Sequence, residues 1–173
     1  MAFHEILGAF VGNPFVYFLL VFGFSILVAI ILPIPIELAL VVALAQPGIA
    51  LFLAALLAVA LGKAVGAWLV FVLGIMVEHA MHRWAQRASW IAKVLGALEK
   101  FVRWSGSVGL FVLLSIPLMS DTAVLYFYAL FNEEGKTIDQ RHFILTNFLA
   151  GVSRVSLFFI LAFTIFPWLL PTP

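Results

Sequence analysis

The chain has 173 residues and a net charge of +1; 65% of its residues are hydrophobic and only 10% are charged. A soluble domain carries roughly 25% charged residues, so this composition excludes an ordinary soluble domain and predicts a single membrane domain, residues 1–173. The few cations are scattered, which argues against a nucleic-acid-binding surface. Cysteine is absent, which excludes disulfides and thiolate chemistry.

The first segment, residues 1–13, is predicted to form a short interfacial helix. Its apolar residues recur at helical spacing: Phe3, Ile6, Leu7 and Phe10. No basic region precedes them, so a cleaved signal peptide is not expected.

Residues 15–77 form the predicted first half of the membrane domain. They open with an apolar stretch, Phe15–Ala45, that Pro33 and Pro35 interrupt. Each proline removes a backbone donor and disfavours helix in the residue before it. Only ten residues remain between Pro35 and the turn at 46–48, about half the length of a helical span. We therefore expect a re-entrant helical hairpin with its tip at these prolines; a kinked span is the alternative.

The next stretch, Ile49–Val77, is continuous apart from Lys63. It exceeds the ~20 residues that a helix needs to cross a bilayer. Gly62 and Gly66 flank the lysine at a spacing that lets a neighbouring helix approach closely. We therefore expect a long transmembrane helix that packs against another element through these glycines.

Residues 78–107 form a connector that carries five cations: Arg83, Arg87, Lys93, Lys100 and Arg103. Its apolar residues recur every three or four positions, so we expect one or two amphipathic helices along the membrane surface. Cationic loops face the cytoplasm, which predicts a cytoplasmic connector in a multi-pass protein of the plasma or inner membrane. His79 and His82 are three residues apart here, a spacing that is common by chance, so no metal site is expected.

The second half, residues 108–170, repeats the order of the first. Val108–Phe131 is an apolar stretch broken by Pro117, and Phe143–Leu170 is continuous apart from Arg154 and a proline near its end, Pro167. The same reasoning predicts a second hairpin with Pro117 at its tip, followed by a second long span. One hairpin would enter from each side of the membrane. The expected fold is therefore all-α, with two re-entrant hairpins and two long transmembrane helices in an inverted repeat.

Four ionisable residues lie inside the apolar stretches: Glu37, Lys63, Asp121 and Arg154. A charge at bilayer depth costs at least ~2.5–3.5 kcal/mol, so it persists where it is paired, hydrated or functional. Each half contributes one acid beside its prolines and one base within its long span, and Gly151 allows close helix packing beside Arg154. We predict that the four side chains form a substrate and proton pathway at the midplane. In the competing, structural interpretation the acids cap backbone groups at the helix breaks and the bases form ion pairs.

Motifs of enzymatic chemistry are absent from the sequence. It contains no Gly-rich phosphate loop, no metalloprotease motif and no nucleophile elbow. We therefore expect no enzymatic activity, no cofactor and no metal.

The order of these features resembles the DedA superfamily, also called SNARE-associated Golgi or VTT-domain membrane proteins. The resemblance covers about residues 27–160 and rests on Pro33, Pro35, Glu37, Gly62, Gly66, Phe71, Gly74, Gly106, Pro117, Phe143, Asn147 and Gly151. The chain departs from the family's usual pattern at Ile36 and Ala67. It also has Ser115 and Asp121 where the family often has arginines around the second proline.

The resemblance implies a transporter that moves lipids between leaflets, either a translocase of polyprenyl phosphate or a phospholipid scramblase, with proton coupling in some members. The implied partners are membrane lipids with anionic phosphate headgroups and protons, and a homo-oligomer stays open. Lys63 and Arg154 would replace the family's arginines. Two other functions also stay open: a proton-coupled transporter of small solutes or ions, and a non-transporting assembly or scaffold protein.

Overall fold

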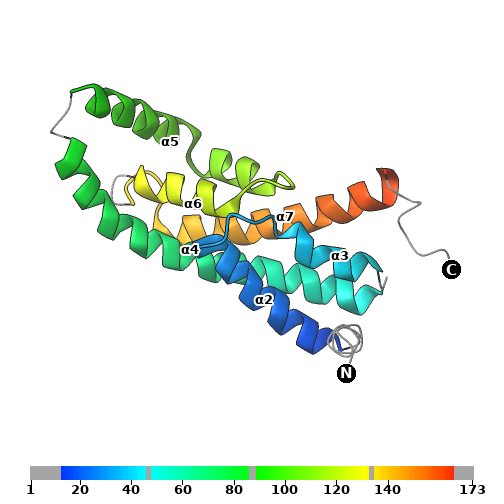
Figure 1. The fold of residues 1–173 in the computed structure, drawn as a ribbon. Helices are drawn as coiled ribbons and strands as arrows, with labels where there is room; N and C mark the ends of the chain where they lie inside the picture. Colours follow the sequence, from blue (N-terminus) through cyan, green and yellow to red (C-terminus); the bar gives the residue numbers. More distant parts are fainter. Residues whose placement is uncertain (1–12, 46–47, 86–88, 133–134, 166–173) are drawn as a thin grey trace.

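A computed structural model describes residues 13–45, 48–85, 89–132 and 135–165 (Figure 1). Within these ranges the chain is helical, without strands, which confirms the predicted all-α class. The helices are α2 (Pro14–Ile30), α3 (Glu37–Ala45), α4 (Ile49–Ala85), α5 (Ser89–Ser115), α6 (Asp121–Leu130) and α7 (Gln140–Ile165). The interfacial helix predicted for the first 13 residues lies almost entirely outside the described residues.

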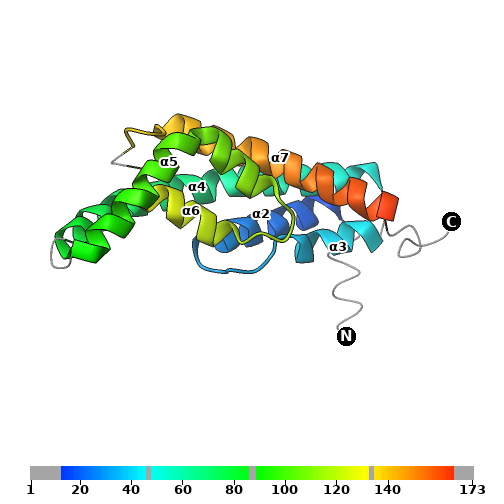
Figure 2. The ribbon, with the colours of Figure 1, turned by 90° about the horizontal axis from the view of Figure 1, so that it is seen from above.

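The first part of the described chain, α2, residues 31–36 and α3, is here called the first broken segment. Asn13 caps the start of α2 by accepting a hydrogen bond from the Phe15 backbone N–H at 3.0 Å, and a proline at the first helical position fits that start. Helix α2 ends at Ile30, shortly before Pro33, because proline cannot continue the backbone ladder. Figures 1 and 2 show the chain turning back here, so that α3 runs opposite to α2.

Helix α4 is the longest element and differs from the prediction at its end. It has 37 residues and continues to Ala85, so the first eight residues of the predicted connector extend this helix. The apolar residues of the connector keep a helical period, so nothing in the pattern at position 78 could have stopped the helix.

The second broken segment consists of residues 107–115 of α5, residues 116–120 and α6. Helical geometry is interrupted inside α5 at Gly106, whose φ of +50° is accessible to glycine at little cost. This break separates the connector portion of α5 from residues 107–115. Figure 2 shows the chain reversing again between the end of α5 and α6.

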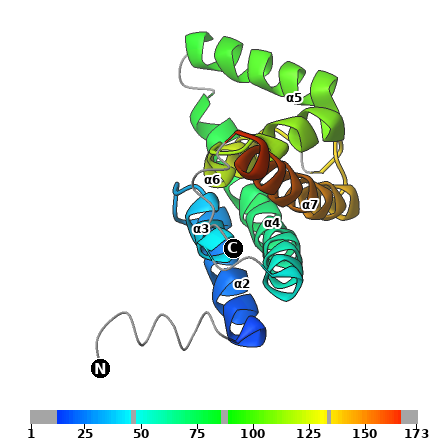
Figure 3. The ribbon, with the colours of Figure 1, turned by 90° about the vertical axis from the view of Figure 1, so that its right-hand side faces the viewer.

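Two helices in the described part of the chain are long and apolar enough to cross a membrane: Ile49–Gly74 of α4 and Gln140–Ile165. The predicted pair of long apolar helices is thus confirmed. Helix α7 starts after Asp139, whose carboxylate accepts the His142 backbone N–H at 2.9 Å. This hydrogen bond and, to a smaller extent, a hydrogen bond from the His142 side chain lower the pKa of the Asp139 carboxyl group. Seen from the side, α4 lies between α2 and α7 (Figure 3).

The interior consists of two apolar clusters. One contains residues of α5, α6, the later part of α4 and the first part of α7, for example Ala67 and Ala150. The other contains residues of α2, α3, the first part of α4 and the later part of α7, for example Val59 and Val155. Along α4 and α7 the two clusters meet where Lys63 and Arg154 lie, so the charges mark their boundary.

Large apolar side chains also cover the outside. On α4, Leu53, Leu57, Leu61 and Val65 are 37–48% exposed and recur every four residues, which places them along one face. Contiguous apolar surface of this kind is rare on soluble monomers and indicates contact with a membrane or a partner.

Candidate functional site: a buried charge network

The four charged residues singled out in the sequence come together in one buried network. Their exposed fractions are 3% for Glu37, 0% for Lys63, 2% for Asp121 and 0% for Arg154. The two acids begin α3 and α6, directly after the two tips, and the two bases lie within α4 and α7. We call these four residues the charge network.

Arg154 joins the two broken segments. Its Nε donates to Glu37 Oε1 at 2.6 Å and its Nη2 donates to Glu37 Oε2 at 3.0 Å, which makes the pair bidentate. Its Nη1 donates to Asp121 Oδ1 at 2.8 Å, and Nη2 also donates to the Met119 carbonyl at 2.8 Å. One guanidinium therefore holds the first acid, the second acid and the backbone of the second tip.

Lys63 completes the network from α4. Its Nζ donates to Asp121 Oδ1 at 2.8 Å and to the Leu114 carbonyl at 3.3 Å. The sequence left open which acid would pair with Lys63, and the structure pairs it with Asp121. Glu37 pairs with Arg154. Two carboxylates and two cations balance, which reduces the cost of burying each one.

The two tips also satisfy each other's backbone groups. Glu37 Oε1 accepts the backbone N–H of Leu118, in the second tip, at 3.1 Å. In return, the single hydroxyl proton of Thr122 lies within reach of two carbonyls, that of Val28 in the last turn of α2 and that of Leu32 in the first tip, with Oγ1 3.0 Å from the latter. Carbonyls at a helix end lack an intrahelical partner, so this threonine caps the opposite segment. Backbone groups of each broken segment therefore depend on a side chain of the other segment for a hydrogen bond.

Leu118 stands out in the second tip because of its backbone. Its φ is +66°, a left-handed conformation that costs a residue with a Cβ roughly 1–2 kcal/mol. Its side chain is 69% exposed, so burial of the side chain does not offset this cost. The hydrogen bond from its N–H to Glu37 is one of the contacts that stabilise this conformation, together with the Arg154 bond to the Met119 carbonyl.

Of the two acids, Glu37 binds a backbone N–H at a helix break, as the structural interpretation expects, whereas Asp121 does not. Ser120 caps α6, since its Oγ accepts the Ala123 backbone N–H at 3.4 Å. The Asp121 carboxylate binds Lys63 and Arg154 instead. Glu37 accepts a backbone N–H, but that N–H belongs to the other broken segment.

The predicted prolines and glycines lie around this network. Pro33 and Pro35 lie between α2 and α3, and Pro117 lies between α5 and α6. A Cβ on Gly66 would come within 2.4 Å of Ala29 Cβ, and one on Gly62 within 2.5 Å of Ser25 Cβ. These two glycines therefore let α2 pack directly on α4.

Gly151 plays the same part between the two long helices. A Cβ there would come within 3.0 Å of the Ala60 Cα and 3.2 Å of the Lys63 Cδ. Its missing side chain lets α7 approach α4 beside the network, which brings Arg154 and Lys63 to the same carboxylate.

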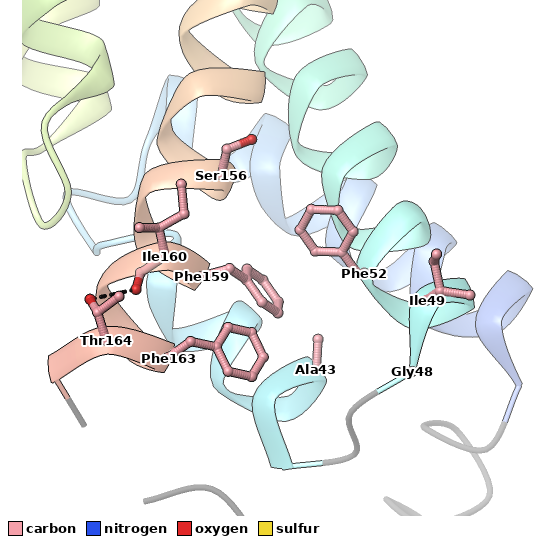
Figure 4. A pocket seen from close by; sticks show the side chains of 9 residues that line it. All are labelled: Ala43, Gly48, Ile49, Phe52, Ser156, Phe159, Ile160, Phe163 and Thr164. Atoms are coloured by element: carbon pink, nitrogen blue, oxygen red, sulfur yellow. Dashed lines mark hydrogen bonds between the residues drawn. The ribbon is translucent and has the colours of Figure 1, made fainter. Parts of the chain in front are cut away.

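A groove of about 570 Å³ lies away from the network, between the end of α3, the start of α4 and the last turns of α7 (Figure 4). It is lined by Ala43, Gly48, Ile49, Phe52, Ser156, Phe159, Ile160, Phe163 and Thr164. The hydroxyls of Ser156 and Thr164 donate to carbonyls of their own helix at 2.8 and 2.7 Å. The groove is therefore apolar in its chemistry.

Sequence reasoning missed three contributors to the site: Thr122, Met119 and the backbone of Leu118. A threonine one residue after a candidate acid is a weak signal, and the carbonyls it caps lie at least 90 residues away. Within the described residues no group of three or more His, Cys, Asp or Glu could hold a metal ion. The side chains of His79 and His82 lie outside that part.

A scan against protein-family models, a search of curated proteins and a search of solved structures each found no match to this chain.

Proposed function

We propose that this chain is a multi-pass membrane transporter of the DedA type that moves lipids between leaflets, as a translocase or a scramblase. The observation that carries the proposal is the charge network, which joins the tips of two broken segments through Arg154 while remaining at most 3% exposed. Buried ionisable groups in a membrane segment mark substrate or proton pathways more often than they serve as inert glue.

The proposed topology has α4 and α7 as spanning helices and the two broken segments as re-entrant hairpins of an inverted repeat. Helices α3 and α6 have 9 and 10 residues. At 1.5 Å per residue they reach about 15 Å, half of the ~30 Å hydrocarbon core. A non-helical tip at that depth is tolerated where protein or water satisfies its backbone. The reciprocal bonds of Glu37 and Thr122 meet this requirement.

The proposed mechanism follows from the pairing. Arg154 binds Glu37 with two parallel hydrogen bonds, and a phosphate headgroup presents the same geometry as that carboxylate. Protonation of an acid would release its basic partner to an anionic headgroup and separate the two tips. Lys63 then holds the second segment through Asp121 while Arg154 exchanges partners.

Reconstitution in vesicles with a labelled phospholipid or polyprenyl phosphate tests this function. We expect transbilayer movement above that of empty vesicles, and a return to the empty-vesicle rate for Arg154→Met in protein that still folds, because the group that would bind the headgroup is lost. Lys136→Met is the matched control, because it removes an exposed cation outside the network. A rate equal to that of empty vesicles at every pH would overturn the proposal. Solute-dependent proton flux without lipid movement would favour the small-solute transporter.

The scaffold alternative makes a different prediction for paired neutral substitutions. If the charges only hold helices together, Lys63→Met combined with Asp121→Asn should keep full function, because the Glu37–Arg154 pair stays intact. As parts of a transport site, the same two substitutions should abolish lipid movement even when the double variant is as stable as the parent. A charge swap is less informative, because Asp121 also contacts Arg154 and a lysine at position 121 would face that guanidinium.

A further inference from the structure

The apolar groove at the ends of the two long helices is separate from the charge network. It lies between Ala43 of α3, residues 48–52 at the start of α4 and residues 156–164 of α7 (Figure 4). Phe163 lines it and follows Arg154 on α7 by about two and a half turns, so the two side chains leave that helix on opposite sides. The groove therefore needs an explanation of its own.

The lining of the groove suits a hydrocarbon ligand. None of its residues is charged, and its only polar side chains, Ser156 and Thr164, use their hydroxyl protons within α7. A charged headgroup would find no counter-charge there. The volume of about 570 Å³ falls within the ~300–1,000 Å³ that is usual for ligand sites.

The groove is continuous with the apolar exterior of the molecule. Ile49, on its wall, is 80% exposed and begins the row of exposed side chains that continues every fourth residue along α4 at Leu53 and Leu57. On α7, the lining residues Ile160 and Phe163 are 56% and 48% exposed. In a membrane this surface lies against hydrocarbon. A groove in it does not stay empty, because its lining atoms would lose their dispersion contacts.

The length of the groove selects the occupant. From Ser156 to Thr164 it extends about 12 Å along α7, at 1.5 Å per residue. It also lies where the apolar part of α4 begins and that of α7 ends, hence on one side of the membrane. One leaflet supplies about half of the ~30 Å hydrocarbon core, which matches this length. An incoming helix would find room for only about two turns.

We propose that the groove binds one acyl chain of a membrane phospholipid, from the leaflet at which α4 begins and α7 ends. Because Ala43 belongs to α3, the bound chain contacts the first broken segment as well as both long helices. The inference rests on the membrane location that the proposed function also requires. It depends neither on transport nor on the charge network.

Photolabelling from a lipid chain tests the site. The full chain would be reconstituted in phosphatidylcholine vesicles with a small fraction of phosphatidylcholine that carries a diazirine on one acyl chain, and mass spectrometry would locate the adducts. By exposure alone, Leu53, which is 48% exposed and outside the groove, should be labelled more than its half-buried neighbour Phe52, which lines it. A chain held in the groove reverses this order, and we expect that reversal.

The other two outcomes would overturn the proposal. Equal labelling of Phe52 and Leu53 would indicate ordinary contact with bulk lipid. Labelling of Leu53 alone would mean that no lipid chain enters, as when a second copy or residues 166–173 of the same chain fill the groove.

Filling the groove provides the matched variants. Ser156→Trp places a ring in the groove and should abolish the excess labelling of Phe52. Leu157→Trp, at the next position of α7, is 40% exposed and outside the groove, so it should keep the excess. Ile49→Trp, at a lining position that is 80% exposed, replaces Ser156→Trp if that variant does not fold. Excess labelling that survives the filling would contradict the site.

The acyl-chain site and the transport function can fail separately, because labelling requires no lipid movement. Vesicles without transbilayer movement in which Phe52 is still labelled in excess would overturn the transport function and leave the site. Movement without that excess would do the reverse.

Discussion

Arg154 is the residue on which the two broken segments depend most. It contacts Glu37, Asp121 and the Met119 carbonyl with one planar group. An arginine side chain offers five donors in a fixed fork, whereas lysine offers three around a single point charge. The three acceptors around one planar group therefore favour arginine over lysine at this position.

Replacing Arg154 by lysine should break the contact between the tips while keeping the charge. A lysine cannot hold both acids and the Met119 carbonyl, so at least one buried carboxylate loses its partner, at a cost of about 3 kcal/mol. We expect this loss in the free energy of unfolding, together with loss of lipid movement. Arg141→Lys, at an exposed position, is the control and should change neither quantity. Full stability of Arg154→Lys would show that the guanidinium contacts are not needed.

Two substitutions at Leu118 test whether the backbone of the second tip is strained. Because its φ is +66°, Leu118→Gly should relieve backbone strain, whereas Leu118→Ala keeps the Cβ that causes it. The glycine variant should be more stable than the alanine variant by about 1 kcal/mol in denaturant unfolding. Both variants lose the same exposed side chain, so the comparison isolates the backbone. Equal stability of the two would mean that the tip is unstrained.

The helices were predictable where local signals define them. Pro33, Pro35 and Pro117 predicted the interruptions, and Gly62 with Gly66 predicted the close helix contact that α2 makes. These signals depend on backbone donors and side-chain size near one position. The extension of α4 to Ala85 was missed because an apolar pattern of helical period does not mark where a surface helix begins.

Contacts between distant positions could not be derived in the same way. The sequence supplied two acids and two bases, but the Glu37–Arg154 pair joins residues 117 positions apart, and no periodicity decides between the possible pairings. The capping of α2 by Thr122 likewise depends on how two tips meet in space. Such contacts follow from the packing of α2 and α7 against α4, which local patterns do not encode.

The glycine contact between α2 and α4 can be tested with one kind of substitution at two positions. Gly66→Ala places a Cβ 2.4 Å from Ala29 Cβ, so the helices must separate, at a cost of about 1–3 kcal/mol. Gly23→Ala, also within a helix, meets nothing within 4 Å and should gain up to about 1 kcal/mol from helix propensity. Thermal unfolding of both variants measures the difference. Equal effects would contradict direct α2–α4 packing at Gly66.

In the molecule as a whole, the charge network lies where two apolar clusters meet. Lys63 on α4 and Arg154 on α7 lie at the boundary between the two apolar clusters. Hydrogen bonds and ion pairs, which can exchange partners, link the two tips to each other. We therefore expect the two broken segments to separate at their tips, and we expect lipid movement to require that separation.

Lipid movement with the tips cross-linked tests this claim most directly. The chain has no cysteine, so Leu38→Cys and Leu118→Cys, both at exposed positions beside the Glu37–Leu118 hydrogen bond, would give the only two thiols. A cleavable bifunctional thiol reagent would join them in vesicles that contain a labelled lipid, with each single-cysteine variant as control. We predict that movement falls to the empty-vesicle rate when the tips are joined and returns when the linker is cleaved. Movement at an unchanged rate with the tips joined would contradict the account.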